Sequence, residues 1–459
     1  MPRTVPLDIA PLLEPVRLPL LPTPNPRRSS MPQTQGPLPV CAPMRNGAPA
    51  PARLGAPREK ESPVNRDASS IVDASASDLL ELDHELSEAE LEVRDSVRAF
   101  VDRRIRSNIA SWYDEGVFPL ELVPEMAELG LLGMHIEGYG CAGKSAVEYG
   151  LAMQELEAGD SGIRTFVSVQ GSLAMSAIAK HGSEEQKQTW LPRMAAGEVI
   201  GCFGLTEPTA GSDPSSMLTT ARRDGDAWVI DGAKRWIGLA SIAQLAIIWA
   251  MTDSGVRGFI VPTDSQGFTA VPIAQKLSMR ASIQCDITLE GVRVSADAML
   301  PGAQGLSGPF SCLNEARYGI AWGAVGAARD SFDAALGYAQ ERLQFGKPLA
   351  GYQLTQKKLV DWALEIQKAQ LVALHLGRRK DAGTLQRHMI SVAKLNNTRI
   401  AIDIARDARS MLGGNGITLD YSPLRHANNL ESVRTYEGTD EVHTLILGER
   451  LTGISAFRG

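Results

Sequence analysis

The sequence predicts a multidomain α+β protein in which a helical segment is followed by a compact antiparallel β domain and then by a second helical segment. Three observations predict this order. Apolar residues recur at helical spacing before residue 200, short β-branched runs between turn signals follow, and helical spacing returns near Phe310. Because helices and strands are segregated, a dinucleotide-binding sheet of parallel strands is not indicated. We expect domains at 79–200, 201–301 and 302–459.

The first helical segment begins near Ser87. Ser87 and Glu90 have the spacing of a capping box, and valines recur at helical spacing from Val93 onward. Further helices of this segment are expected at 120–132, at 145–158 and from Ser183, which precedes Gln186 as Ser87 precedes Glu90.

The middle segment alternates short apolar runs with the turn signals Asp-Gly and Glu-Gly, which is typical of antiparallel strands. Strands are expected around 228–230, 245–249, 258–261, 268–271 and 285–289. Long helical patterns then cover 317–342, 353–382, 385–412 and 441–454.

Residues 1–78 differ in composition from the rest of the chain. They hold 16 of the 27 prolines and no aromatic residue, and the first aromatic side chain is Phe100. Such a segment cannot bury enough apolar surface to offset the entropy of ordering it. We therefore expect a disordered, proline-rich tail.

Composition excludes several functional classes for the remainder. The net charge is −7 with a pI near 5.7, and no basic stretch stands out, so nucleic acid and anionic membranes are poor partners. No apolar run has the length of a membrane-spanning helix, so we expect no stable membrane insertion. The five scattered cysteines show neither metal-ligand spacing nor a disulfide framework, which is typical of a reducing cytoplasm.

A lone carboxylate lies at a sharp turn near the C-terminus. Glu437 stands between an aromatic residue and Gly438 in the run TYEGT, directly before a helical pattern. Glycine lets the backbone turn sharply and approach a ligand closely, and a carboxylate at such a turn can face a cavity and act as a base. A solvated turn is the ordinary interpretation of the Glu-Gly pair alone, so the catalytic hypothesis depends on the other segments.

Three further features suit a large anionic ligand. The run LTEPTAGSD (205–213) gathers hydroxyls and backbone amides, which suit the oxygens of a flavin ring and a pyrophosphate. Trp236 could pack against an aromatic cofactor, and Arg342, in RLQFGKPL, could bind a phosphate. The structural alternatives are a turn that satisfies its own hydroxyls, a core tryptophan and a solvated arginine at a helix end.

Arg164 is the only charged residue between Asp160 and Lys180. A lone arginine in an apolar stretch is either paired internally or directed at an anionic ligand, because an unpaired buried charge is very costly. Asp160, four positions earlier, is the candidate structural partner. The residues alone leave both interpretations open.

Taken in order, four runs resemble the acyl-CoA dehydrogenase family of flavoenzymes: LTEPTAGSD at 205–213, RLQFGKPL at 342–349, MLGGNG at 411–416 and TYEGT at 435–439. Longer runs, including DSGIRTFVSVQGSL at 160–173, are most similar to the glutaryl-CoA dehydrogenase branch. The resemblance covers nearly all of the chain after the tail. It implies a helical N-terminal domain, a β domain and a C-terminal four-helix bundle, assembled as a homotetramer.

The resemblance also implies that FAD is the cofactor and that an adjacent subunit completes its site. The positions that match flavin-contacting residues of the family are Phe203, Thr206, Ser212, Trp236, Gly238, Arg342, Gln353, Met411, Leu412, Gly413, Gly414, Thr439 and Glu441. Those that match substrate-binding residues are Arg164, Thr165, Ser212, Phe310, Arg317, Gly438 and Phe457.

Glu437 matches the catalytic base of the family. The resemblance implies that Glu437 removes the α-proton of an acyl-CoA thioester while the β-hydrogen leaves as hydride to the flavin. With glutaryl-CoA, the favoured substrate, the distal carboxylate then leaves as CO2 and crotonyl-CoA forms. Arg164 and Thr165 match the positions that hold this carboxylate, for which a bidentate guanidinium is well suited. Electrons would pass to an electron-transfer flavoprotein.

Two departures from the family keep other hypotheses open. Threonine is common where Gly238 stands, and Ile163 and Asp440 differ from the usual residues of the glutaryl branch. A short-chain acyl-CoA dehydrogenase or oxidase without decarboxylation is therefore the alternative function. A non-catalytic scaffold that binds flavin or acyl-CoA is a third hypothesis, and the presence of Glu437 argues against it.

The composition of the tail generates the first testable prediction. Deleting residues 1–78 should leave the melting temperature and the activity essentially unchanged, because a proline-rich segment without aromatic residues contributes little to a core. Thermal melts and turnover of the full-length and shortened chains check this. A fall of several degrees would mean that the tail docks on the folded domains.

Overall fold

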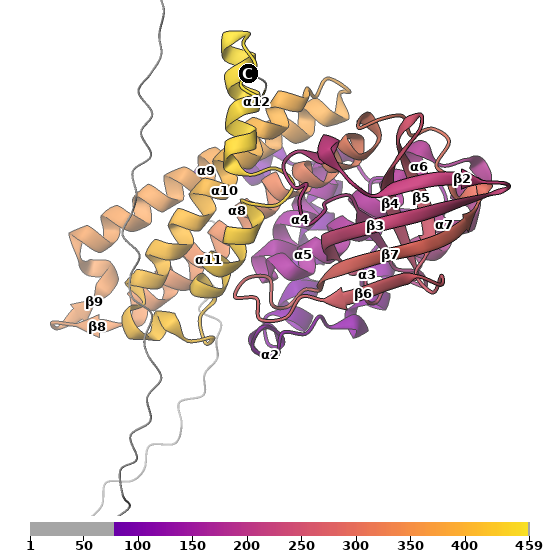
Figure 1. Ribbon diagram of the computed structural model, residues 1–459. Coiled ribbons are helices and arrows are strands. Elements are labelled where there is room, and N and C mark those ends of the chain that lie inside the picture. Colours follow the sequence, from indigo (N-terminus) through magenta and orange to yellow (C-terminus); the bar gives the residue numbers. More distant parts are fainter. Residues whose placement is uncertain (1–77, 458–459) are drawn as a thin grey trace, which may run out of the picture. The chain divides into compact units, whose positions relative to one another are not determined.

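The computed structural model describes residues 78–457, whose helices and strands follow the predicted order of a helical, a β-sheet and a second helical domain (Figure 1). The expected tail lies outside the described residues except for Asp78, whose carboxylate accepts hydrogen bonds from the N–H groups of Leu82 (2.9 Å) and Asp83 (3.1 Å). The N-terminal domain contains η2 (Leu82–Glu85), α1 (Glu88–Phe100), η3 (Val101–Ile105), α2 (Ile109–Glu115), η4 (Leu120–Leu122), α3 (Val123–Glu128), α4 (Ala146–Gly159), α5 (Ser161–Val167), η5 (Ser168–Met175), α6 (Ser176–His181) and α7 (Glu184–Ala195).

The caps of these helices confirm the predicted starts. The Ser87 hydroxyl accepts a hydrogen bond from the N–H of Glu90, whose carboxylate accepts one from the N–H of Ser87, and α7 begins with the same arrangement. Each pair satisfies two N–H groups that a helix start leaves without a partner. The helix predicted over 120–132 was wrong in extent, because α3 ends at Glu128 and Gly130 has a left-handed φ of 67°.

Seven strands form the sheet of the central domain: β1 (Gly201–Gly204), β2 (Thr220–Asp224), β3 (Ala227–Gly238), β4 (Leu245–Thr252), β5 (Gly255–Pro262), β6 (Phe268–Pro272) and β7 (Gln284–Ser295). Two short helical turns, η6 (Pro214–Ser216) and η7 (Ala296–Ala298), accompany them. The strand order is β1-β4-β2-β3-β7-β6, and β5 also pairs with β4. The prediction of a purely antiparallel domain was wrong in one respect, because β1 and β2 pair with β4 in parallel.

Two strands of this central sheet, β1 and β2, were not predicted. All four residues of β1 are buried and two of them are glycine, so no alternation of apolar and polar residues marks the strand. In β2 only Ala221 is buried, and the remaining residues are polar and exposed. Both strands are defined by their hydrogen-bonded neighbours in the sheet more than by their own composition.

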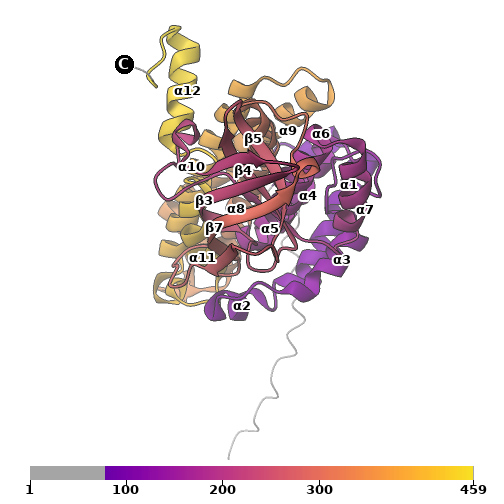
Figure 2. The ribbon, with the colours of Figure 1, turned by 45° about the vertical axis from the view of Figure 1, so that its right-hand side comes forward.

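The C-terminal domain contains α8 (Ser307–Glu341), β8 (Leu343–Gln344), β9 (Lys347–Pro348), η8 (Leu349–Gly351), α9 (Gln353–Asp381), α10 (Arg387–Met411), η9 (Gly413–Ile417), α11 (Ser422–Val433) and α12 (Asp440–Thr452). Helices α8 to α11 pack against one another as the expected four-helix bundle. Helix α12 begins on α10 and extends away from the bundle (Figures 1 and 2). Helix α11 was not predicted, because several of its buried residues are polar, among them Arg425, His426 and Asn429.

The β domain is fixed to the N-terminal helices through η5. The side-chain amide of Gln170 donates to the carbonyls of Met194 (3.1 Å) and Val199 (2.8 Å), and its oxygen accepts from the N–H of Gly201 (2.8 Å). One buried side chain therefore ties the start of β1 to the helical segment that carries Arg164. In Figure 2 the sheet lies in front of α5 and α8.

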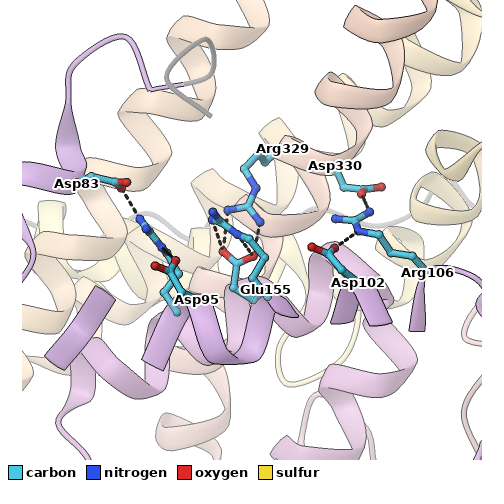
Figure 3. A network of polar contacts seen from close by, with 9 residues as sticks. Asp83, Asp95, Asp102, Arg106, Glu155, Arg329 and Asp330 are labelled. Carbon is cyan, nitrogen blue, oxygen red and sulfur yellow. Dashed lines mark hydrogen bonds and ion pairs between the residues drawn. The ribbon is translucent and has the colours of Figure 1, made fainter. Parts of the chain in front are cut away.

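Charged side chains join the N-terminal helices to the bundle (Figure 3). The buried carboxylate of Glu155 on α4 accepts hydrogen bonds from Arg98 of α1 (3.1 Å) and from Arg329 of α8 (2.6 and 2.7 Å). Burial alone raises the pKa of Glu155, but the guanidinium groups of Arg329 and Arg98 outweigh burial and lower it to about 2. Nearby, Asp330 of α8 pairs with Arg106.

Glu155→Gln should destabilise the fold by about 3–5 kcal/mol, because it leaves two guanidinium groups without their buried counter-ion. Since the pKa of Glu155 is lowered, its contribution to stability is present above the ordinary value of 4.5 and is lost as the pH falls toward 2. Unfolding of both proteins at pH 7 and at pH 3 measures this difference.

Asp95→Asn is the matched control. Asp95 pairs with Arg94 in the same region, but its side chain is 59% exposed. Its removal should cost less than about 1 kcal/mol. Equal losses in the two variants would contradict the assignment of Glu155 as a structural ion pair.

Candidate active site

The turn that carries Glu437 connects α11 to α12. Glu437 has a φ of 56° and Gly438 a φ of 99°, so two successive residues lie in the left-handed region. This conformation is costly for a residue with a side chain, by about 1–3 kcal/mol, and persists only where the surroundings impose it. A side chain at Gly438 would also approach Nε2 of His443 to 3.0 Å, so the glycine is needed on two grounds.

Two cations from the bundle hold the main chain of this turn. Nζ of Lys394, on α10, donates to the carbonyls of Tyr436 (2.7 Å) and Gly438 (2.6 Å). Nε of Arg317, on α8, donates to the carbonyl of Glu437 itself (2.7 Å). Three successive carbonyls are therefore bound by charged donors, which form stronger hydrogen bonds than neutral ones.

Arg164 is fully buried on α5 and is paired with Glu157 of α4, not with Asp160. Its Nε donates to Oε2 of Glu157 (2.6 Å), and its Nη2 donates to the hydroxyl of Tyr436 (2.5 Å). The predicted partner, Asp160, instead caps α5 by accepting from the N–H of Gly162 (2.6 Å) and pairs with Arg425 of α11. Asp160 is the N-cap of α5, and its carbonyl accepts from the N–H of Arg164 (3.2 Å), but its carboxylate is bound to Gly162 and Arg425 and does not pair with the guanidinium.

A glycine on α8 makes room for the Arg164–Glu157 pair. A β-carbon added to Gly323 would collide with the Glu157 carboxylate and would lie 3.3 Å from Nε of Arg164. Helix α8 therefore approaches α4 closely at this point, and the pair lies in the junction of α4, α5 and α8. Despite burial, the Glu157 carboxylate holds the pKa of Arg164 above its usual value.

Among the described residues, the buried polar atoms of the site that have no hydrogen-bond partner include Nη1 of Arg164 and Oε2 of Glu437. Leaving such atoms unsatisfied is costly, and in native proteins the exceptions call for an explanation such as a ligand. One is a cation and the other a carboxylate, and each influences the pKa of the other. The pair therefore suits a ligand with a negative charge at one end and an acidic proton at the other.

Burial raises the pKa of Glu437 above its ordinary value of 4.5, although Arg164, Lys394 and Arg317 each lower it. A carboxylate in this state is a stronger base than a solvated one. Burial lowers the pKa of Lys394 below its ordinary value of 10.5. The guanidinium carbon of Arg164 lies 5.8 Å from the centroid of the Tyr436 ring, a cation–π contact beside the turn.

The predicted flavin residues of the β domain lie side by side. The N–H of Arg235 donates to the carbonyl of Thr206 (2.9 Å), so the loop at 205–213 lies next to Trp236. Trp236 has a φ of 62° at an irregularity of β3, and its ring is 52% exposed. Glu207 of this loop forms a buried ion pair with Lys234 of β3 (2.8 Å). Phe203 is buried on β1, and Ser212 is exposed on the loop.

Gly238, where the family commonly has threonine, is close to η5. A β-carbon at this position would lie 3.2 Å from Cγ2 of Val169. A larger residue would need Val169 to move, so glycine here is matched to a neighbour on the segment that follows Arg164 and Thr165.

The second group of predicted flavin residues lies at the other end of the bundle. Arg342 ends α8, Gln353 begins α9, and Met411 to Gly414 lie where α10 passes into η9. Figure 1 shows this end, marked by β8 and β9, far from the sheet. Phe345 between the two strands is 97% exposed. One chain does not bring the two groups together.

The remaining predicted residues are divided between the turn and other places. Thr165 lies 3.4 Å from the Tyr436 hydroxyl, and Phe310 is one heptad before Arg317 on α8, so the two share a face of the helix. Thr439 caps α12, and Glu441 is exposed on that helix. Phe457 follows the far end of α12 and is not brought to Glu437.

Sequence reasoning missed three residues of the site: Glu157, Lys394 and the tyrosine that precedes Glu437. Lys394 is buried in α10 and shows no ion pair within 4.0 Å among the described residues. The only available signal was a lysine within the apolar pattern of that helix.

Within residues 78–457, no cluster of histidine, cysteine or acidic side chains could hold a metal ion. No helix in this range has the length and apolarity required to cross a membrane.

Three family models match the chain in sequence order. They describe the N-terminal domain (residues 87–198), the middle domain (202–292) and the C-terminal domain (303–452) of acyl-CoA dehydrogenases. The short-chain specific acyl-CoA dehydrogenase of Homo sapiens mitochondria is 35% identical over 375 residues, which are 80% of this chain and 91% of the relative.

Two solved structures of a glutaryl-CoA dehydrogenase from Mycobacterium smegmatis are similar to this fold. One is 60% identical with a TM-score of 0.82 and covers 83% of this chain and 99% of its own. The other, in complex with FADH2, is 57% identical with the same TM-score and covers 83% and 98%. The resemblance stated from the sequence, and the fold expected from it, are confirmed.

Proposed function

This chain belongs to the acyl-CoA dehydrogenase family of oxidoreductases, and we propose that it oxidises and decarboxylates glutaryl-CoA to crotonyl-CoA and CO2. One observation carries the choice of substrate. Nη1 of the buried Arg164 and Oε2 of Glu437 both lack a partner among the described residues, and the two groups belong to one electrostatically coupled site. A dicarboxylic thioester supplies a carboxylate for the first group and an α-proton for the second.

FAD, the cofactor of this family, fits the residues present. The exposed Trp236, the hydroxyls of Thr206 and Ser212 and the backbone amides of their loop would hold one part of it. Arg342, Gln353 and 411–414 of a second copy would hold the rest, since a single chain keeps them apart. FAD, when bound, supplies the acceptor for the two electrons of the oxidation.

Glu437 is the base that takes the α-proton. Its desolvated carboxylate is more basic than one in water, and Oε2 is free of protein donors that would hold its lone pairs. The α-proton of a thioester is weakly acidic, so its removal also needs stabilisation of the enolate oxygen by hydrogen-bond donors. The chain positions Glu437 by fixing the three carbonyls from 436 to 438.

Arg164 binds and orients the distal carboxylate. Glu157 holds its Nε and Tyr436 its Nη2, so Nη1 is the donor left for a substrate. A fixed guanidinium loses little entropy on binding a carboxylate. Decarboxylation of the oxidised product requires this carboxylate to leave as CO2, with the electron pair delocalised into the thioester. Protonation at the far carbon then gives crotonyl-CoA, and Glu437 holds the proton that it took from the α-carbon.

The assembly and the electron acceptor are part of the proposal. A homotetramer would supply the second group of flavin residues to each site, and the exposure of Phe345 is consistent with a contact between copies. An electron-transfer flavoprotein is the acceptor we propose, with oxygen as the alternative that the departure at Gly238 leaves open.

Glu437→Gln should retain FAD and the fold but lose about 10²-fold or more of kcat, because an amide cannot take the α-proton. In the wild-type protein, kcat/KM should fall as the pH drops through the pKa of Glu437, with a midpoint above 4.5 because burial raises that pKa. Stopped-flow reduction of the flavin measures both effects. Glu449→Gln is the control, because Glu449 is an exposed acidic residue on α12. If Glu437→Gln were as active as the control variant, Glu437 would not be the base.

Arg164→Gln should lower kcat/KM for glutaryl-CoA by the free energy of a buried charge pair, about 2–5 kcal/mol. It should lower kcat/KM for butyryl-CoA, which has no distal carboxylate, far less. Both thioesters can give crotonyl-CoA, so released CO2 is the diagnostic product. The rate of oxidation of each thioester and the amount of CO2 released are measured with a dye as the electron acceptor.

The ion pair requires a matched control, because Arg164→Gln leaves Glu157 buried and unpaired. The double variant, Glu157→Gln combined with Arg164→Gln, removes both charges. It should show the same selective loss of kcat/KM for glutaryl-CoA, with a smaller drop in melting temperature than Arg164→Gln alone. Glu157→Gln alone keeps the guanidinium and should keep the preference for glutaryl-CoA. Equal losses on the two thioesters would contradict the proposed substrate and favour a short-chain acyl-CoA dehydrogenase.

A further inference from the structure

Lys394 is a buried lysine whose ammonium group is bound to main-chain oxygens. It is 1% exposed, and Nζ donates to the carbonyls of Tyr436 and Gly438 at 2.7 and 2.6 Å. Burying an ammonium group is costly, and the usual compensation is a paired carboxylate. None lies within 4.0 Å of Lys394 among the described residues. The compensation therefore comes from the turn itself.

The two carbonyls bound by Lys394 flank the catalytic carboxylate. Between them stands Glu437, the one non-glycine residue of the turn in the left-handed region. The peptide planes on both sides of Glu437 set the direction of its Cα–Cβ bond. Lys394 holds the plane before Glu437 through the carbonyl of Tyr436, and through the carbonyl of Gly438 it also holds the plane that follows Gly438. Arg317 holds the plane between Glu437 and Gly438 through the carbonyl of Glu437, whereas of the two cations only Lys394 joins the two ends of the turn.

We propose that Lys394 is a positioning residue, which clamps the carbonyls on either side of Glu437 and directs the Glu437 carboxylate at the α-proton. This inference rests on the proposed function. Lys394 does not touch the substrate in this role. Its effect reaches the reaction through Glu437, whose placement to within about 1 Å can change a rate by about 10²-fold.

The charge of Lys394 has a second effect on Glu437. A cation near a carboxyl group favours the charged form, so Lys394 lowers the pKa of Glu437 against the effect of burial. Among the described residues, four other titratable groups face Lys394, and replacing Lys394 does not change whether each of them is charged or neutral. They are Arg317 from α8, Arg164 from α5, and Asp440 and His443 from α12.

The two arginines stay protonated at every working pH. Asp440 is paired with Arg399 (3.1 Å) and Arg434 (2.5 Å). Burial is the largest cause that lowers the pKa of His443 to about 3, and the charge of Lys394 adds to it. Burial remains when Lys394 is replaced, so this imidazole stays neutral across the working range. A change in the pH profile after removal of Lys394 therefore reports on Glu437.

Two variants separate the clamp from the charge. Lys394→Met removes both, whereas Lys394→Gln removes the charge but retains an amide donor. We expect kcat to fall about 10- to 100-fold in Lys394→Met and less in Lys394→Gln, with KM within about threefold of wild type. In the pH profile of kcat, the acid limb is the range in which kcat falls as Glu437 becomes protonated. This limb should move to higher pH in both variants, by on the order of one unit, because both lose the cation.

Lys276→Met is the matched control. Lys276 also donates from Nζ to two main-chain carbonyls, those of Met279 (2.8 Å) and Ser282 (2.7 Å), but these lie outside the Glu437 turn. Its loss should lower the melting temperature without moving the acid limb. Rates are normalised to bound FAD, so that loss of folded enzyme is not counted as loss of kcat.

Both thioesters are used, because α-proton removal is common to glutaryl-CoA and butyryl-CoA. Equal losses of kcat on the two substrates, with the shifted acid limb, support the positioning role even if the glutaryl preference is wrong. An unchanged kcat per flavin or an unmoved acid limb overturns it. Lys394 variants that do not fold, beside a folded Lys276→Met, assign Lys394 to the core and also overturn it. Wild-type protein that oxidises no acyl-CoA overturns the proposed function, and this inference with it.

Discussion

The ion pair of Arg164 and Glu157 is the constraint around which the site is built. A guanidinium and a carboxylate are fully buried where α4, α5 and α8 meet, and such a pair is stable only if its remaining donors and acceptors are satisfied. Ser161 provides one donor to Glu157 (2.8 Å), and Tyr436 accepts from Arg164. Through that tyrosine the pair is joined to the turn of Glu437. The unsatisfied Nη1 is then the natural place for a ligand carboxylate.

Buried ion pairs also hold the domains together. Glu155 lies two residues before Glu157 on α4 and binds arginines from α1 and α8, while Asp160 at the end of α4 binds Arg425 of α11. Helix α4 is buried along its whole length, and its acidic residues Glu155 and Glu157 each bind a cation on a neighbouring helix. The position of α4 between α1 of its own domain and α8 of the bundle therefore fixes the catalytic turn relative to Arg164.

Much of the fold could be predicted from local patterns. The capping boxes at Ser87 and Ser183 were correct, because a cap is formed by residues three apart in the chain. Helix α11 was missed because its buried face is polar, and β1 because its burial has no alternation. The partner of Arg164 was wrong because the carboxylate of Asp160 is bound to Gly162 and Arg425, so that Glu157 and not Asp160 pairs with the guanidinium.

The sequence by itself determined the order of the domains, the family and the candidate base, because these depend on periodicity and on short motifs such as the one around Glu437. It also marked Arg164 as a charge that needs a partner. Only the tertiary structure decided which partner that is, and that Lys394, some forty residues from the turn along the chain, binds the carbonyls around Glu437. These contacts join distant segments, and their geometry follows from how α8 and α10 pack beside the turn, which no local pattern encodes.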